Sequence, residues 1–165
     1  MTAYDPAQWS DLFVATAGAS AALAGLLFVA VSINLDRILG EAGLPDRALE
    51  TVLLLLSVLL VSVVCLIPGQ SSGALGTELL FLSLTIALVI LRLPTLGFAS
   101  GFTPPRTWVW SRWGVRLFGT VPFVAGGASV LLEAGGGLYW VAAGVVFALV
   151  GAVANAWVLL VEILR

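Results

Sequence analysis

The hydrophobic and polar positions of this chain fall into long blocks. Five apolar stretches, each about 19 to 24 residues long, are separated by short polar segments. The stretches are residues 12–35, 48–67, 75–93, 113–132 and 138–161. A helix rises ~1.5 Å per residue, so each stretch can cross a hydrocarbon core of roughly 30 Å. The pattern predicts an all-α fold: a single domain, residues 1–165, built as an integral membrane bundle of five transmembrane helices.

The polar segments contain residues that end or redirect helices. The sequence GEAGLPDRALE at 40–50 predicts a polar turn whose proline and aspartate suit the first turn of the next helix. PGQSSG at 68–73 and EAGGG at 133–137 predict tight turns. TPPRTW at 103–108 is expected to be a longer connection, because two prolines cannot continue a helix.

Composition strengthens the membrane prediction and excludes several kinds of chemistry. Hydrophobic residues make up 61% of the chain and charged residues 10%, which leaves no room for a separate soluble domain. A net charge of -2 argues against nucleic acid as a partner. With no histidine and with Cys65 alone in an apolar run, the usual metal, haem and nucleophilic sites lack their residues. We therefore expect no cofactor, no metal and no enzymatic activity.

The arginines predict the orientation. If the N-terminus is outside, every basic residue falls on the cytoplasmic side: Arg37, Arg47, Arg92, Arg106, Arg112, Arg116 and Arg165. The opposite side then holds acidic residues and no arginine. Because cytoplasmic loops are enriched in Lys and Arg, the pattern predicts N-out and C-in insertion into the cytoplasmic membrane of a bacterial cell.

Two helices have stripes of small residues. The first stripe consists of Gly18, Ala21, Ala22 and Gly25, and the last helix has Gly144, Ala148 and Gly151. Small residues let helix backbones approach closely in lipid, so these faces are predicted packing surfaces. They could join the first and last helices within one subunit, or join copies of the chain into a homo-oligomer.

A charged residue inside the third helix suggests a polar site. Arg92 lies in the run LVILRLP (88–94), and Thr85 lies seven residues before it, on the same face. Counting the helical rise places Arg92 level with Asn155, within reach of Glu162. The predicted site is thus a hydrogen bond from Arg92 to Asn155 and an ion pair with Glu162, with Thr85 on the same pathway.

Arg92 has a simpler interpretation as well. Its side chain could extend to the lipid headgroups, as long basic side chains near helix ends often do. Pro94 favours a buried site, because it ends the helix and frees backbone carbonyls that protein or water must satisfy. Arg106 and Arg112 are expected to meet lipid phosphates, and Arg116 to anchor the interface near Trp113.

The opening helix also carries a resemblance. The sequence WSDLFVATAGASAALAGLLFVAVSINLDRIL resembles the start of a group of small multi-pass bacterial membrane proteins. Some of these are provisionally described as modulators of a membrane-bound protease. The similarity covers about a fifth of the chain and identifies no functional residues. It implies an accessory or regulatory role.

Two functions follow from these patterns. In the first, the chain forms an oligomeric channel- or transporter-like bundle that moves an ion or small solute past Arg92, Thr85, Asn155 and Glu162. In the second, it is a non-conducting accessory protein that binds another membrane protein through its small-residue faces. The expected partners are membrane lipids, further copies of the chain and, in the second case, a membrane protein.

Overall fold

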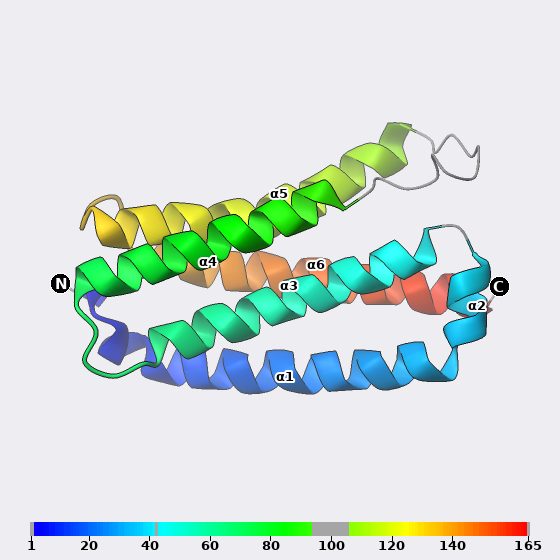
Figure 1. Ribbon diagram of the computed structural model, residues 1–165, viewed down its shortest axis with the longest axis horizontal. Coiled ribbons are helices and arrows are strands. Elements are labelled where there is room, and N and C mark those ends of the chain that lie inside the picture. Colours follow the sequence, from blue (N-terminus) through cyan, green and yellow to red (C-terminus); the bar gives the residue numbers. More distant parts are fainter. Residues whose placement is uncertain (1, 42, 94–105, 165) are drawn as a thin grey trace.

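The computed structural model describes residues 2–41, 43–93 and 106–164, and the regular structure in this part of the chain is helical (Figure 1). The long helices are α1 (Ser10–Ile33), α3 (Leu44–Cys65), α4 (Ser72–Arg92), α5 (Arg106–Leu131) and α6 (Leu138–Leu164). Shorter elements are the 3-10 turns η1 (Thr2–Tyr4) and η2 (Pro6–Trp9) and the helix α2 (Leu35–Gly40). Within these described residues, five helices are long and apolar enough to cross a membrane, which confirms the all-α prediction and its five long apolar helices.

The helix that contains the second apolar stretch begins earlier than that stretch. The stretch is predicted at 48–67, while α3 begins at Leu44, with Pro45 and Asp46 in its first turn as predicted. Gly43 has a φ of 95°, which glycine adopts without strain, and Pro45 occupies the first turn of α3, where its missing N–H costs nothing. Residues 44–50 are therefore helical, and Glu50 lies buried inside the bundle.

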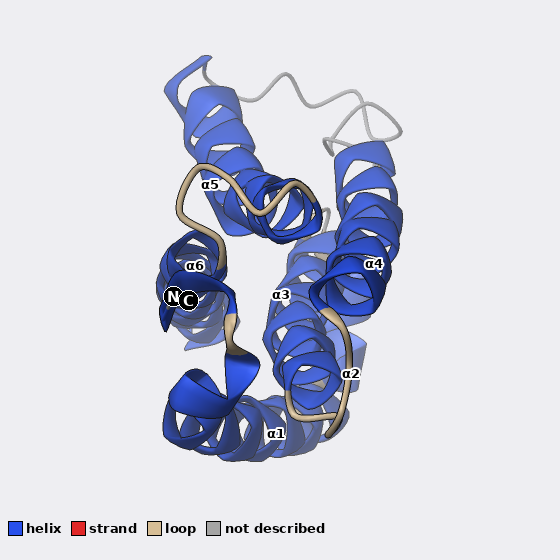
Figure 2. Ribbon diagram, turned by 90° about the vertical axis from the view of Figure 1, so that its left-hand side faces the viewer, coloured by secondary structure: helices blue, strands red, loops and turns tan. Residues whose placement is uncertain are grey.

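The helices pack as an antiparallel bundle with α3 at its centre (Figures 1 and 2). Helix α3 packs against α1, α4 and α6, while α5 packs against both α4 and α6. Helix α1 packs chiefly on α3 and touches α6 little. The predicted pairing of the first and last helices within one subunit is therefore wrong, because α3 takes the main contacts of α1. In the apolar stretch of α1 17% of residues are buried, against 56% in α3.

Glycines set the contact between α4 and α5. A Cβ added at Gly76 would lie 2.5 Å from the backbone nitrogen of Leu131, and one at Gly127 would lie 2.6 Å from that of Leu80. At such distances the two backbones could not keep their present separation. These glycines allow the close approach of α4 and α5, as small residues do between helices in lipid.

The small residues of α6 are used inside the bundle. A Cβ at Gly144 would lie 2.8 Å from the ring of Phe123 on α5, and one at Gly151 would lie 2.8 Å from the side chain of Val115. Ala148 between them is fully buried. The stripe on α6 thus serves the contact with α5 and α3.

The two ends of the bundle differ in chemistry. At the N-terminal end, the Tyr4 hydroxyl accepts a hydrogen bond from the Gly136 N–H, and the rings of Trp9 and Tyr139 meet edge to face with centroids 4.7 Å apart. The last turns of α6 lie at the opposite end, beside α2 (Figure 1). The arginines with described side chains belong to that second end: Arg37, Arg47, Arg92, Arg112 and Arg116. We call it the arginine end.

Candidate functional site

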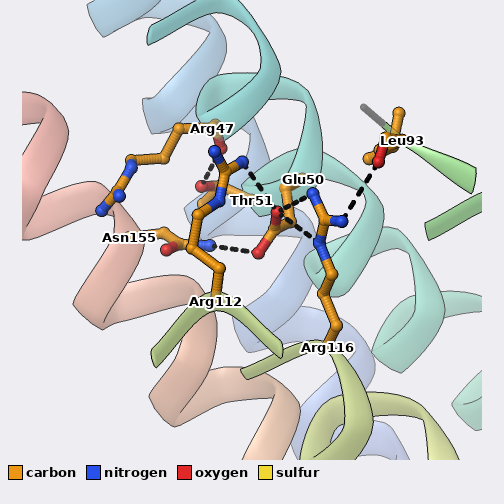
Figure 3. A network of polar contacts seen from close by, with 7 residues as sticks. All are labelled: Arg47, Glu50, Thr51, Leu93, Arg112, Arg116 and Asn155. Carbon is orange, nitrogen blue, oxygen red and sulfur yellow. Dashed lines mark hydrogen bonds and ion pairs between the residues drawn. The ribbon is translucent and has the colours of Figure 1, made fainter. Parts of the chain in front are cut away.

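A buried carboxylate lies at the centre of the arginine end. Glu50 is 0% exposed, and its position six residues after Leu44 places it roughly 9 Å along α3. A charged group at that depth requires polar partners, because an unpaired charge in an apolar interior is very costly. Figure 3 shows that these partners come from α5 and α6.

Three side chains donate to the two oxygens of Glu50. The Oε2 atom accepts from Arg112 Nη2 at 3.2 Å and from Arg116 Nε at 3.0 Å. The Oε1 atom accepts from Asn155 Nδ2 at 3.2 Å. The two arginines are four residues apart, so they share one face of α5. We call Glu50, Arg112, Arg116 and Asn155 the Glu50 cluster.

Arg116 also joins α4 to the cluster. Its Nη1 donates to the Leu93 carbonyl at 3.1 Å, and Leu93 is the C-terminal cap residue of α4. The last carbonyls of a helix have no partner within the helix, and a cationic donor suits them well. Pro94 lies outside the described residues, but the carbonyl just before it has a protein donor. One guanidinium group therefore links the end of α4 to Glu50 on α3.

The charges of the cluster do not cancel. Two guanidinium groups surround one carboxylate, and the three charged side chains are between 0% and 5% exposed. Arg116 Nη2 lies 3.0 Å from Glu50 Oε2 as an ion pair, yet it has no acceptor in hydrogen-bond geometry. The hydrogen bond to that oxygen comes from Nε, and Nη2 is close to it without pointing an N–H at it. The cluster carries one net positive charge among these residues.

This arrangement limits what Glu50 can do chemically. Both carboxylate oxygens already accept hydrogen bonds from protein donors, so neither is open to a substrate unless a donor moves away. What the geometry does directly is tie α3, α4, α5 and α6 together. Buried ion pairs seldom stabilise more than apolar packing would, but removing one partner is very destabilising.

The structure does not bring the predicted pathway residues together. Asn155 is buried, but its partner is Glu50, to which its amide donates, rather than Arg92, from which it was predicted to accept a hydrogen bond. Arg92 lies exposed on α4, which agrees with its alternative interpretation as a residue that faces the lipid headgroups. Thr85 is also exposed, and its hydroxyl donates to the Phe81 carbonyl of its own helix at 2.8 Å. The side chain of Glu162 lies outside the described residues.

The residues that do form the site were assigned other roles, or none, from the sequence. From the sequence, Glu50 falls in the second apolar stretch with no role assigned, Arg112 is expected to meet lipid phosphates, and Arg116 is expected to anchor the interface near Trp113. Arg112 is 5% exposed and Arg116 0%, so neither arginine faces lipid, although the Arg116 guanidinium does lie 6.0 Å from the centre of the Trp113 ring. The four-residue spacing of the two arginines is the signal that could have found the site. The side chain of Arg106 lies outside the described residues.

Comparison with protein-family models gives no match, and no curated protein or solved structure matches the chain significantly. The class of this protein is therefore inferred from its own fold and site. The five long apolar helices of the described residues fit a multi-pass membrane protein, and four of them are joined at the arginine end by the Glu50 cluster. The resemblance carried by the opening helix stays a prediction.

Proposed function

We propose that this chain is a non-conducting accessory membrane protein that works by lateral association, first of all with a second copy of itself. The contact surface is the small-residue face of α1, formed by Gly18, Ala21, Ala22 and Gly25. In this proposal α3 to α6 form a firm body held by the Glu50 cluster, and α1 presents its outer face to a partner. The N-terminus is outside and the arginine end faces the cytoplasm.

The observation that carries the proposal is that no other part of the folded chain packs against the small residues of this face. A Cβ added at Gly18 or Gly25 would meet no atom within 4 Å, and the two alanines between them are exposed. The glycines of α6, by contrast, are in close contact with α5. Small residues let two helix backbones approach closely, which is how helices associate in lipid. The folded chain leaves this surface without such a contact.

The face points away from the bundle. The residues of α1 that are buried, among them Phe13, Thr16, Ser20 and Leu27, lie on the opposite side of the helix. A hydrogen bond of 2.9 Å between the hydroxyls of Thr16 and Ser62 fixes the rotation of α1 against α3. The small residues are therefore held facing outward.

Replacing both Gly18 and Gly25 with leucine is expected to dissociate the oligomer into monomers. Two large side chains would hold the partner helix away, and a loss of about 1.4 kcal/mol already weakens association tenfold. The particle mass in mild detergent, measured by light scattering after gel filtration, is expected to fall from that of an oligomer to that of a monomer.

The matched control is Ala19→Leu, on an exposed alanine about 100° around α1 from Gly18. That variant is expected to keep the wild-type mass. The proposal would be wrong if the wild-type chain is monomeric over the measured range, or if the Gly18/Gly25 and Ala19 variants have the same mass. The wild-type particle could instead contain the same foreign membrane protein in every preparation, and the Gly18/Gly25 variant could lack it. That result would confirm the contact surface but show that its partner is another protein.

A second candidate function is movement of a small anion. It is favoured by the net positive charge of the Glu50 cluster, because apolar packing would hold the helices at lower cost than buried charge does. Here the cluster, rather than Arg92, would attract the anion. Chloride flux into liposomes containing the wild-type chain is expected to fall about tenfold or more in Arg116→Gln and to persist in Arg92→Gln. Equal flux in both variants, or none in the wild type, would rule this candidate out.

A further inference from the structure

The Glu50 cluster holds more positive charge than its single carboxylate balances. Arg112 and Arg116 both keep their charge, because a guanidinium group is not deprotonated in proteins, and both are almost fully buried. Within the described part of the chain, Glu50 is the one carboxylate that pairs with either of them. A buried charge without a counter-charge is costly, above all at membrane depth. The cluster therefore favours the approach of one further negative charge.

One nitrogen of Arg116 still has unused hydrogen-bond donors. The Nε atom donates to Glu50 at 3.0 Å, and Nη1 donates to the Leu93 carbonyl at 3.1 Å. The Nη2 atom is shielded from solvent and has no hydrogen-bond acceptor, although it lies 3.0 Å from Glu50 Oε2. Buried donors are normally paired, and an anion is the strongest acceptor for a cationic N–H group. Arg116 Nη2 is thus a donor suited to an anion.

The neighbouring groups do not supply the missing acceptor. Both oxygens of Glu50 already accept from Arg112, Arg116 and Asn155. The ring of Trp113 lies with its centroid 6.0 Å from Arg116 Cζ, which is at the outer limit of cation–π attraction. Neither group balances the second guanidinium.

We infer that the Glu50 cluster binds one singly charged anion, with Arg116 Nη2 as its main donor. One negative charge makes the cluster neutral. A doubly charged ion such as sulfate would leave the cluster with an excess of negative charge and would lose more hydration on entering. The anion has two possible sources of the same chemistry: a small ion such as chloride from the water at the arginine end, or the phosphodiester of a phospholipid headgroup.

The bound anion has a structural role. It binds the folded cluster, which exists only when α3, α5 and α6 are packed together, so it stabilises the folded chain by mass action. The inference does not depend on association through α1. It shares its site with the second candidate function, but it requires the anion to bind and not to cross the membrane.

Thermal unfolding at constant ionic strength tests the inference. The full chain in an uncharged detergent is unfolded in sodium gluconate, whose anion is bulky, and in mixtures with rising sodium chloride. Constant ionic strength keeps general screening the same. The unfolding temperature of the wild type is expected to rise and level off, by about 2–4 °C at several times the dissociation constant. The rise is expected to vanish in Arg116→Gln and to persist in Arg92→Gln, whose side chain is exposed on α4.

Phosphorus analysis of the same preparations distinguishes the two sources. A lipid phosphate in the site would block chloride, so the wild type and Arg92→Gln would each retain one phospholipid per chain and Arg116→Gln none. Either pattern supports the anion site. A chloride effect of equal size in the wild type and Arg116→Gln would overturn it, as would the absence of both chloride and phospholipid effects.

If Arg116→Gln does not fold, the chloride NMR signal decides on wild-type protein stripped of phospholipid. Line broadening that nitrate removes and gluconate does not remove supports the site, and no broadening overturns it. The light-scattering mass of these samples is expected not to change with chloride, so failure of the association proposal is a separate result. Chloride binding without flux would leave this site standing and rule out anion movement.

Discussion

Replacing Glu50 with glutamine is expected to lower the free energy of unfolding by about 3–5 kcal/mol, the loss typical of breaking a buried ion pair on one side. Glutamine keeps the size of the side chain but removes its charge. Arg112 and Arg116, both almost fully buried, would then lack a counter-ion, and one amide donor would face them. Denaturation in detergent, followed by circular dichroism, measures the change.

The control for this variant is Glu133→Gln, because Glu133 is exposed at the other end of the bundle. It is expected to change stability by no more than about 0.5 kcal/mol. A double-mutant cycle with Arg112→Gln should show a coupling of about 0.5–3 kcal/mol, since the two side chains share a contact. If Glu50→Gln is as stable as the wild type, the cluster does not hold the bundle together.

The second large effect is expected at Gly127, where α5 meets α4. Alanine there would place its Cβ 2.6 Å from the backbone nitrogen of Leu80 and 2.8 Å from its Cα. Backbone atoms cannot swing aside as a side chain can, so the helices must separate along their contact. We expect Gly127→Ala to cost about 1–3 kcal/mol of stability, the usual range for overpacking a core.

Gly114 on the same helix is the matched control. A Cβ at Gly114 would meet no atom within 4 Å, so alanine there should be neutral or stabilise by up to about 1 kcal/mol through its higher helix propensity. The two substitutions are chemically identical and differ in surroundings alone. Equal effects at both positions would show that α4 and α5 are not as close as described.

The number of spans could be predicted from the sequence because it depends on a local property, the length of each apolar stretch. Which helices touch could not be predicted in the same way. The stripes on α1 and α6 look alike in sequence, yet Gly144 is covered by Phe123 while Gly18 is bare. That difference depends on which helix faces each stripe: α5 packs on the stripe of α6, while α3 packs on the opposite side of α1. The sequences of α1 and α6 do not contain this information.

The site was missed for a related reason. Asn155 was recognised as a buried polar residue, but its partner was sought on α4, at Arg92, by matching depth alone. Depth fixes the level of a residue in the bilayer and leaves the rotation of its helix undetermined. Glu50 was overlooked because it stands near the start of its apolar stretch, where a carboxylate can equally well face water. Its burial depends on α5 and α6 packing over that end of α3, which the sequence of α3 alone does not specify.

Disulfide trapping in native membranes tests the central claim, that the small-residue face of α1 is a contact surface between copies. Cys65, which is buried, is first replaced by serine so that one introduced cysteine per chain remains. Under mild oxidation, Ala21→Cys is expected to give a covalent dimer, because facing Cα atoms about 4.4–6.8 Å apart can be bridged. Ala19→Cys, on the side of α1, is expected to stay monomeric. Equal dimer yields at the two positions, or no dimer at Ala21, would contradict the account.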